Sequence, residues 1–471
     1  MVKGITYFII ATVGLLFGAV QPWIMSVYAG LMILAFGVLM WQGGRRWRPG
    51  VWVWATVGVF LGVTLFQLTP LPHAFLAWVS PVRAEILAQA EALLGAGHAE
   101  LGSKYTIAYS VNQAFARWGY IVCLALFFWV CVSLGRDRKA YKALVRVAIA
   151  YGGVAAVYGL LQVLIPSVGV WWVPPDFAYP GCARGTYINR NSFAGLMEML
   201  WPLALGVTLA QGEWESRKGV KAALSDDQVN AQLIRFLLVA LMVVALLFSR
   251  SRAGIVGAFV GMAALLWLIR QVSGEFRWGV RIAVMALAAL VVIYGASIGF
   301  DRIMERFFQI ESGAEGRMDI WAQTWDMVKD HPFGVGLGNF QVLEPVYVDP
   351  GRPGISYRLA HNDYLQFLVE AGWVGALALV AGFFLFLIRS IRRVRRIGFE
   401  VGRSRLMVSI GALAGLCSMA FHGFFDFNFQ IPANQVFFVL LLALVEAGLW
   451  PERARSRRSG VGGREAVVGR R

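Results

Sequence analysis

Between Gly4 and Gly44 the chain carries no Asp, Glu, Lys or Arg. An α-helix needs about 20 apolar residues to cross the hydrocarbon core of a bilayer. This stretch therefore has room for two crossings joined by a turn at Gln21 and Pro22. A cleavable signal peptide has a shorter apolar region that ends at small residues, whereas this apolar stretch continues. We expect a retained pair of membrane-spanning helices at the N-terminus.

The rest of the chain has the same character. Of its 471 residues, 58% are hydrophobic and 15% are charged, whereas roughly a quarter of the residues are charged in a soluble domain. Residues 1–452 are predicted to form an all-α integral membrane domain with about twelve transmembrane helices. The predicted spans are 5–20, 23–41, 51–69, 118–135, 147–166, 192–210, 236–249, 252–269, 282–299, 366–388, 406–422 and 431–450.

Basic residues are unevenly distributed between the two sides that these spans define. The N-terminus and every second connection hold 30 of the 43 Lys and Arg residues, although the other side has the longer loops. The positive-inside rule then places both termini in the cytoplasm. The net charge of +16 is explained by contacts with anionic membrane lipids, without nucleic acid as a partner. The basic tail 453–471 is expected to be disordered.

Three long connections remain on the opposite side, 70–117, 167–191 and 300–365. In the first, apolar residues at helical spacing after Pro81 predict an interfacial helix, which packing alone would also explain. In the third, residues 318–328 form an amphipathic pattern that ends before Pro332. Three glycines at 334, 336 and 338 follow, and we interpret them as a turn because no strand precedes them and no helix clearly follows.

Four arginines near span ends on this side run against the positive-inside bias: Arg184, Arg190, Arg250 and Arg252. Each group lies close to the first residue of a predicted span, where free backbone N–H groups favour an anion. The planar guanidinium group is well shaped for phosphate oxygens, so several of them predict a diphosphate site. Arginines that extend to the membrane interface would explain one pair equally well.

His361 opens the segment before the tenth predicted span. An unperturbed histidine titrates near neutral pH, which is suitable for a general base, although an interfacial histidine can also be a hydrogen-bonding bystander. Asp363 is a candidate helix cap. The segment Asp426-Phe-Asn428 is interpreted as structural. Because this side has no Asp-x-Asp pair, the sequence predicts no bound divalent metal and no cofactor.

Several short motifs occur together in a fixed order. They are Arg184-Gly-Thr-Tyr-Ile-Asn-Arg-Asn191 with Ser192, the Ser249-to-Gly254 turn, Arg317 with Trp321, the glycine turn, His361-Asn362, and His422 to Asn434. From about 180 to 435 the chain resembles the bacterial O-antigen ligase and polymerase superfamily. Each motif is loose, and their order, spacing and topological side give the resemblance its specificity.

The resemblance implies a GT-C-like glycosyltransferase in the bacterial inner membrane. Members take a glycan from undecaprenyl diphosphate at the periplasmic face and pass it to a sugar hydroxyl, which for a ligase belongs to lipid A-core. His361 is then the activating or orienting residue. The implied substrate-binding residues are Arg184, Arg190, Asn191, Arg250, Arg252, Arg317 and Asn362. Direct attack on the anomeric carbon would invert its configuration.

Other functions stay open at this point. A polymerase uses the same donor and passes the growing chain to a new repeat unit, and a related enzyme passes it to a protein. A secondary transporter shares the number of spans but typically shows internal repeats and polar residues near the middle of its spans, and neither is clear here. A purely structural membrane protein would explain the spans but not the ordered motifs.

Overall fold

The computed structural model describes residues 1–43, 50–94, 104–174, 177–211, 227–273, 310–348 and 357–450. Within these ranges the chain is helical apart from turns, loops and one short antiparallel strand pair, β1 (Leu71–Pro72) with β2 (Lys104–Tyr105). The all-α fold class is confirmed. The predicted span 282–299 and the tail 453–471 lie outside the described residues.

The described chain up to Gln211 contains eight α-helices, and six of them, all but α4 and α5, coincide with predicted spans. They are α1 (Val2–Thr12), α2 (Pro22–Trp41), α3 (Val51–Phe66), α4 (His73–Val79), α5 (Pro81–Leu94), α6 (Val111–Gly135), α7 (Arg138–Leu164) and α8 (Arg190–Gln211), with the short 3-10 helix η1 (Phe17–Ala19) after α1.

The second half continues the same pattern and includes two helices of the long connection 300–365. Its elements are α10 (Asp227–Phe248), α11 (Arg252–Ser273), α14 (Ile310–Asp330), α15 (Phe340–Tyr347), α16 (Asp363–Ile397), α17 (Arg403–His422) and α18 (Pro432–Gly448), with the short 3-10 helices η3 (Gly398–Val401) and η4 (Asn428–Gln430).

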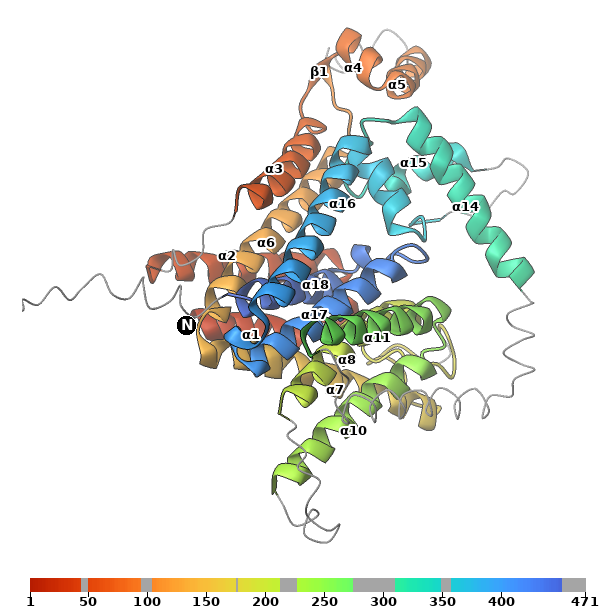
Figure 1. Ribbon diagram of the computed structural model, residues 1–471. Coiled ribbons are helices and arrows are strands. Elements are labelled where there is room, and N and C mark those ends of the chain that lie inside the picture. Colours follow the sequence, from red (N-terminus) through yellow and green to blue (C-terminus); the bar gives the residue numbers. More distant parts are fainter. Residues whose placement is uncertain are drawn as a thin grey trace, which may run out of the picture.

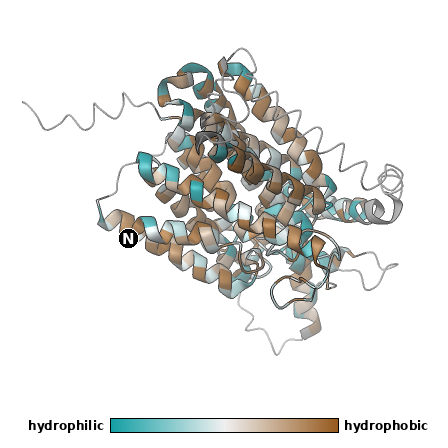
Figure 2. Ribbon diagram, turned by 90° about the horizontal axis from the view of Figure 1, so that it is seen from below, coloured by the Kyte–Doolittle hydropathy of each residue, from teal (hydrophilic) through white to brown (hydrophobic). Residues whose placement is uncertain are grey.

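Eight of the described helices are long and apolar enough to cross a membrane: α2, α6, α7, α8, α10, α11, α16 and α17. The helices α1, α3 and α18 are apolar but shorter. Eleven of the twelve predicted spans therefore coincide with an apolar helix. The ribbons are largely hydrophobic along the bundle (Figure 2), as expected for helices whose outer faces meet lipid rather than water. The protein is a multi-pass membrane protein.

The helices pack into one bundle with a smaller group at one end. Helix α17 packs against α8, α11 and α18, while α3 packs against α16. Helices α4 and α5 lie beyond the end of α3, and α14 and α15 lie beside the first turns of α16 (Figure 1). A separate apolar cluster with Ile320, Val328, Phe340 and Val369 holds α14 and α15 to α16. Both predicted helices of the long connections are thereby confirmed.

The three glycines after α14 form a turn, as predicted. Gly334, Gly336 and Gly338 have φ values of 81°, 93° and 75°, in the left-handed region that residues with a Cβ rarely adopt. Contrary to the prediction, a helix does follow them, because α15 begins at Phe340. The turn places the backbone N–H of Gly338 2.8 Å from the Glu370 carboxylate, which ties it to α16.

Candidate functional site

His361 lies in the loop that enters α16 and contacts the turn between α17 and α18. Its Nδ1 atom is 3.5 Å from Oδ1 of Asp426, and its side chain is 31% exposed. Its ring meets Phe427 edge-on with centroids 4.7 Å apart. The 3.5 Å separation is longer than a strong hydrogen bond, and such contacts often shorten when substrate binds. One ring nitrogen is thus assigned to a carboxylate, which leaves Nε2 for chemistry.

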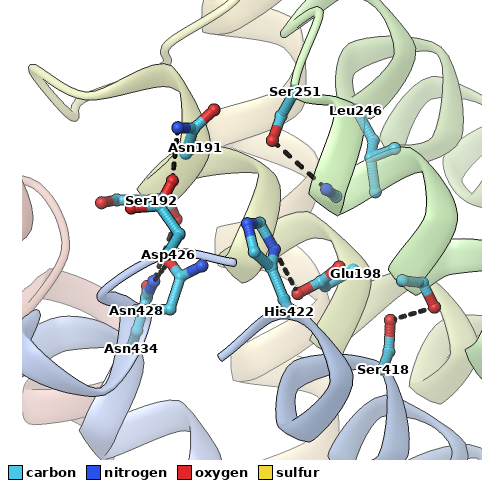
Figure 3. Close-up of polar contacts among 12 residues, drawn as sticks. Asn191, Ser192, Glu198, Leu246, Ser251, Ser418, His422, Asp426, Asn428 and Asn434 are labelled. Carbon is cyan, nitrogen blue, oxygen red and sulfur yellow. Dashed lines mark hydrogen bonds and ion pairs between the residues drawn. The ribbon is translucent and has the colours of Figure 1, made fainter. Parts of the chain in front are cut away.

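Asp426 is buried in the turn after α17. Its Oδ1 accepts a hydrogen bond from the backbone N–H of Phe427 at 2.9 Å, and its Oδ2 accepts one from the Asn191 side chain (Figure 3). Burial acts to raise the pKa of Asp426, but interactions with the side chains of His361 and His422 and with the backbone N–H of Phe427 outweigh it and lower the pKa. The carboxylate is therefore kept ionised beside His361.

The sequence analysis interpreted Asp426 as structural, and the structure adds that it contacts His361, the predicted catalytic histidine. The sequence contained a signal, because an ionisable residue between two apolar spans needs a partner. The partners Asn191 and His361 are far away in the sequence, so no local pattern identified them. Asn428 fits the structural interpretation, because its Oδ1 accepts a hydrogen bond from the Asn434 side chain at 3.0 Å.

Asn362 caps α16, a role that the sequence had assigned to Asp363. The Asn362 side chain accepts hydrogen bonds from the N–H groups of Tyr364 and Leu365 at 3.0 and 3.1 Å, the usual geometry of an N-cap. The Asp363 carboxylate instead accepts one from the N–H of Phe429 at 2.9 Å. Both residues therefore fix the entrance of α16, and Asn362 would influence a substrate mainly by orienting His361.

The two arginine-bearing segments lie side by side. The backbone N–H of Ala183 donates to the carbonyl of Phe248 at 2.9 Å, which joins the loop before α8 to the end of α10. The first segment also reaches the histidine, because Asn191 binds Asp426. The helices α8 and α11 begin at Arg190 and Arg252, so two helix N-termini with their positive dipole ends are combined with the guanidinium groups.

The four arginines differ in their surroundings. Arg184 is buried, donates to the carbonyl of Ala178 and lines a small cavity of about 160 Å³, and burial lowers its pKa. Arg190 contacts the sulfur of Cys182 at 3.5 Å and lies over the ring of Tyr179. Arg250 has a left-handed φ of 54° and Arg252 is exposed. Arg184 is therefore held in place by its own loop, while the other three are more accessible.

Helix α14 places Arg317 and Trp321, two residues of the predicted motifs, near His361 and His422. The indole N–H of Trp321 points at the backbone carbonyl of His361, 3.4 Å away, and its ring lies 6.5 Å from that of Phe425. Arg317, one turn earlier, is close enough to His422 for a Coulombic interaction. Among the described residues, no group of three His, Cys, Asp or Glu side chains is arranged to hold a metal ion.

Behind Asp426 the structure contains a buried pair that sequence analysis missed. Nδ1 of His422 lies 2.8 Å from Oε1 of Glu198, and both side chains have no exposed surface (Figure 3). Glu198 is located within α8, inside an apolar span. The sequence analysis had seen no clear polar residues near the middle of the spans and had not singled out Glu198.

A comparison with protein-family models identifies the central part of the chain. Residues 237–380 match the O-antigen ligase family. The match confirms the resemblance of this segment to the O-antigen ligase and polymerase superfamily, a family associated with a glycosyltransferase type of activity. A search of curated proteins found no match.

The ligase-family segment contains one part of the site and omits another. It includes Arg250, Arg252, Arg317 and His361, whereas Arg190 precedes it. The structure nevertheless connects the two parts, through the Ala183–Phe248 backbone hydrogen bond and through the contact between Asn191 and Asp426. The candidate site is therefore larger than the matched segment.

Proposed function

We propose that this protein transfers a glycan from undecaprenyl diphosphate to a sugar hydroxyl of lipid A-core. The reaction takes place at the periplasmic face of the bacterial inner membrane, in a GT-C-like architecture with both termini in the cytoplasm. The observation that carries the proposal is the contact of His361 with Asp426 next to two arginine-bearing helix N-termini. This arrangement combines a base with groups that stabilise an anionic leaving group.

His361 is the general base in this mechanism. Asp426 faces Nδ1 at 3.5 Å, which favours a proton on that nitrogen, and the neutral ring then keeps a lone pair on Nε2. Nε2 takes the proton of the acceptor hydroxyl as its oxygen attacks the anomeric carbon. The bond between that carbon and the diphosphate oxygen breaks on the opposite side, so the configuration inverts. The proton returns from His361 to solvent or to the released diphosphate, and the enzyme is restored.

Arginines stabilise the charge that the departing diphosphate gains. Arg190, Arg250 and Arg252 surround two helix N-termini, and preorganised donors of this kind can contribute several kcal/mol to a transition state, roughly 3–4 for one donor. This fixed positive charge would do the work that a divalent cation does elsewhere, so we propose metal-independent transfer. Arg184 and Arg317 contribute to the same positive field.

Reconstitution tests the proposal. The purified protein in lipid vesicles is given an undecaprenyl-diphosphate-linked glycan and lipid A-core as the sole acceptor, with a chelator present. We expect transfer to lipid A-core by the wild type and loss of it in His361→Ala. Lengthening of the lipid-linked chain without lipid A-core would instead identify a polymerase, and full transfer by a well-expressed His361→Ala variant would refute the assignment of the base.

A further inference from the structure

The pair formed by Glu198 and His422 is costly to bury. Both side chains are completely inaccessible, with 2.8 Å between Oε1 and Nδ1. Ionisable groups in membrane-spanning helices are expensive and are usually retained for a function, and a buried ion pair adds little to stability compared with apolar residues of the same size. Packing alone therefore gives a weak reason for this pair.

The neighbouring helix leaves space for the pair. Gly257 of α11 faces Glu198 so closely that an added Cβ would collide with Oε2. One turn before His422 on α17, the hydroxyl of Ser418 donates to the carbonyl of Gly257 at 2.6 Å. The pair thus sits where α8, α11 and α17 meet, and α11 is the helix whose first residue is Arg252.

His422 is connected directly to Asp426. Its backbone carbonyl accepts hydrogen bonds from the N–H groups of Phe425 and Asp426 at 2.9 and 3.2 Å. An electrostatic interaction with His422 is also one of the causes that lower the pKa of Asp426. The backbone turn that begins at His422 therefore fixes the position of Asp426, whose carboxylate lies 3.5 Å from His361.

We propose that Glu198 and His422 are positioning residues for glycan transfer: Glu198 holds a positive His422, and His422 keeps the Asp426 carboxylate ionised and oriented toward His361. The inference rests on the proposed function and extends it to two residues that touch no substrate. Five charged or titratable groups act on Asp426 or on the pair from the surrounding elements: His361, Asp363, Glu198 of α8, His422 of α17 and Arg317 of α14.

The test is Glu198→Gln, which keeps the size of the side chain and an oxygen for Nδ1–H but removes the charge. Without the negative charge of its carboxylate partner, the protonated form of the buried His422 is no longer stabilised. We expect kcat to fall about tenfold, with little change in KM for the donor, and the acid limb of the kcat/KM profile to move upward by about half a pH unit or more. A merely structural role would not move the limb.

Ser418→Ala is the matched control. It removes a hydrogen bond between the same helices without changing a charge, so the limb should stay in place even if the melting temperature falls. The double variant Glu198→Gln/His422→Gln, which retains a neutral hydrogen-bonding pair, should reproduce the shift and the loss of kcat.

Three results would overturn the inference. One is a Glu198→Gln enzyme with the kcat and pH profile of the wild type. Another is failure of both the single and the double variant to fold, which would mean that the pair holds the bundle together rather than Asp426 in particular. If the wild type itself transfers no glycan, the proposed function falls and the inference with it.

Discussion

Oδ1 of Asp426 lies 3.5 Å from Nδ1 of His361, although 64 residues separate them in the chain. The carboxylate is also bound by Asn191 of α8 and by the N–H of Phe427. Three segments that are distant in sequence therefore meet at the buried carboxylate of Asp426. An orienting carboxylate on one ring nitrogen sets the tautomer that leaves the other nitrogen free to accept a proton.

Asp426→Asn should therefore reduce kcat by about 10²-fold or more while leaving donor binding largely intact. The amide oxygen can still accept from the N–H of Phe427, but the side chain is uncharged. It therefore no longer favours the His361 tautomer that carries its proton on Nδ1. Single-turnover transfer rates measure the effect. Asp326→Asn, on the exposed face of α14 in an ion pair with Lys329, serves as the control. A transfer rate within twofold of the wild type for Asp426→Asn would contradict the role.

Much of the fold follows from apolar segment length alone. The uncharged stretch from Gly4 to Gly44 contains α2 and all of α1 except its first two residues, and Pro432 opens α18 close to its predicted start. These elements are local, because a helix in lipid satisfies its own backbone and needs only a sufficiently long apolar sequence. The helix in the long connection, ending before Pro332, was predictable for the same local reason.

The site was less predictable because its contacts are not local. His361 stood out by residue type, whereas Glu198 is a single acid among apolar neighbours and its partner His422 lies 224 positions away. Asn362 could not be assigned to the cap until the start of α16 was known. Partner identity, unlike helix position, depends on how the helices pack.

Arg252→Ala should lower kcat/KM for the lipid-linked donor roughly 10- to 100-fold, with partial recovery in Arg252→Lys. The guanidinium offers planar donors to phosphate oxygens at the start of α11, and an ammonium group keeps only the charge. Steady-state kinetics at fixed acceptor concentration measure the loss. Lys139→Ala, exposed in the first turn of α7, should leave the kinetics unchanged. Equal losses in both variants would point to a general surface-charge effect and reject a donor site at Arg252.

Gly334→Ala should destabilise the protein by about 2–4 kcal/mol. Gly334 has φ 81°, and a Cβ there would lie 2.6 Å from the carbonyl oxygen of Glu370. Gly398 has φ 50° with nothing within 4 Å of an added Cβ, so Gly398→Ala should cost only the backbone strain, about 1 kcal/mol. Thermal unfolding in detergent separates the two. Similar losses would show that backbone strain, and not the close approach to α16, dominates.

His331 should make the unfolding free energy depend on pH. It is buried between Tyr109 and Tyr347, with Nε2 3.3 Å from the Tyr347 hydroxyl. Burial lowers its pKa from 6.5 to about 4, against the opposing charge of Asp330 and with a small contribution from Arg83 in the same direction. The unfolded chain therefore binds a proton below pH 6.5 that the folded protein takes up only near pH 4.

The contribution of His331 is thus fully present above pH 6.5, declines as the pH falls toward 4, and is lost below that value, a change of about 3 kcal/mol. His331→Phe keeps a ring but cannot titrate, so its stability should be flatter over this range. Melting temperatures measured between pH 4 and 7 test this, with the exposed His73→Phe as control. His331 directly follows α14, which contacts His361 through Trp321. If the melting temperature of His331→Phe depends on pH as steeply as that of the wild type, another group causes the acid sensitivity of this region.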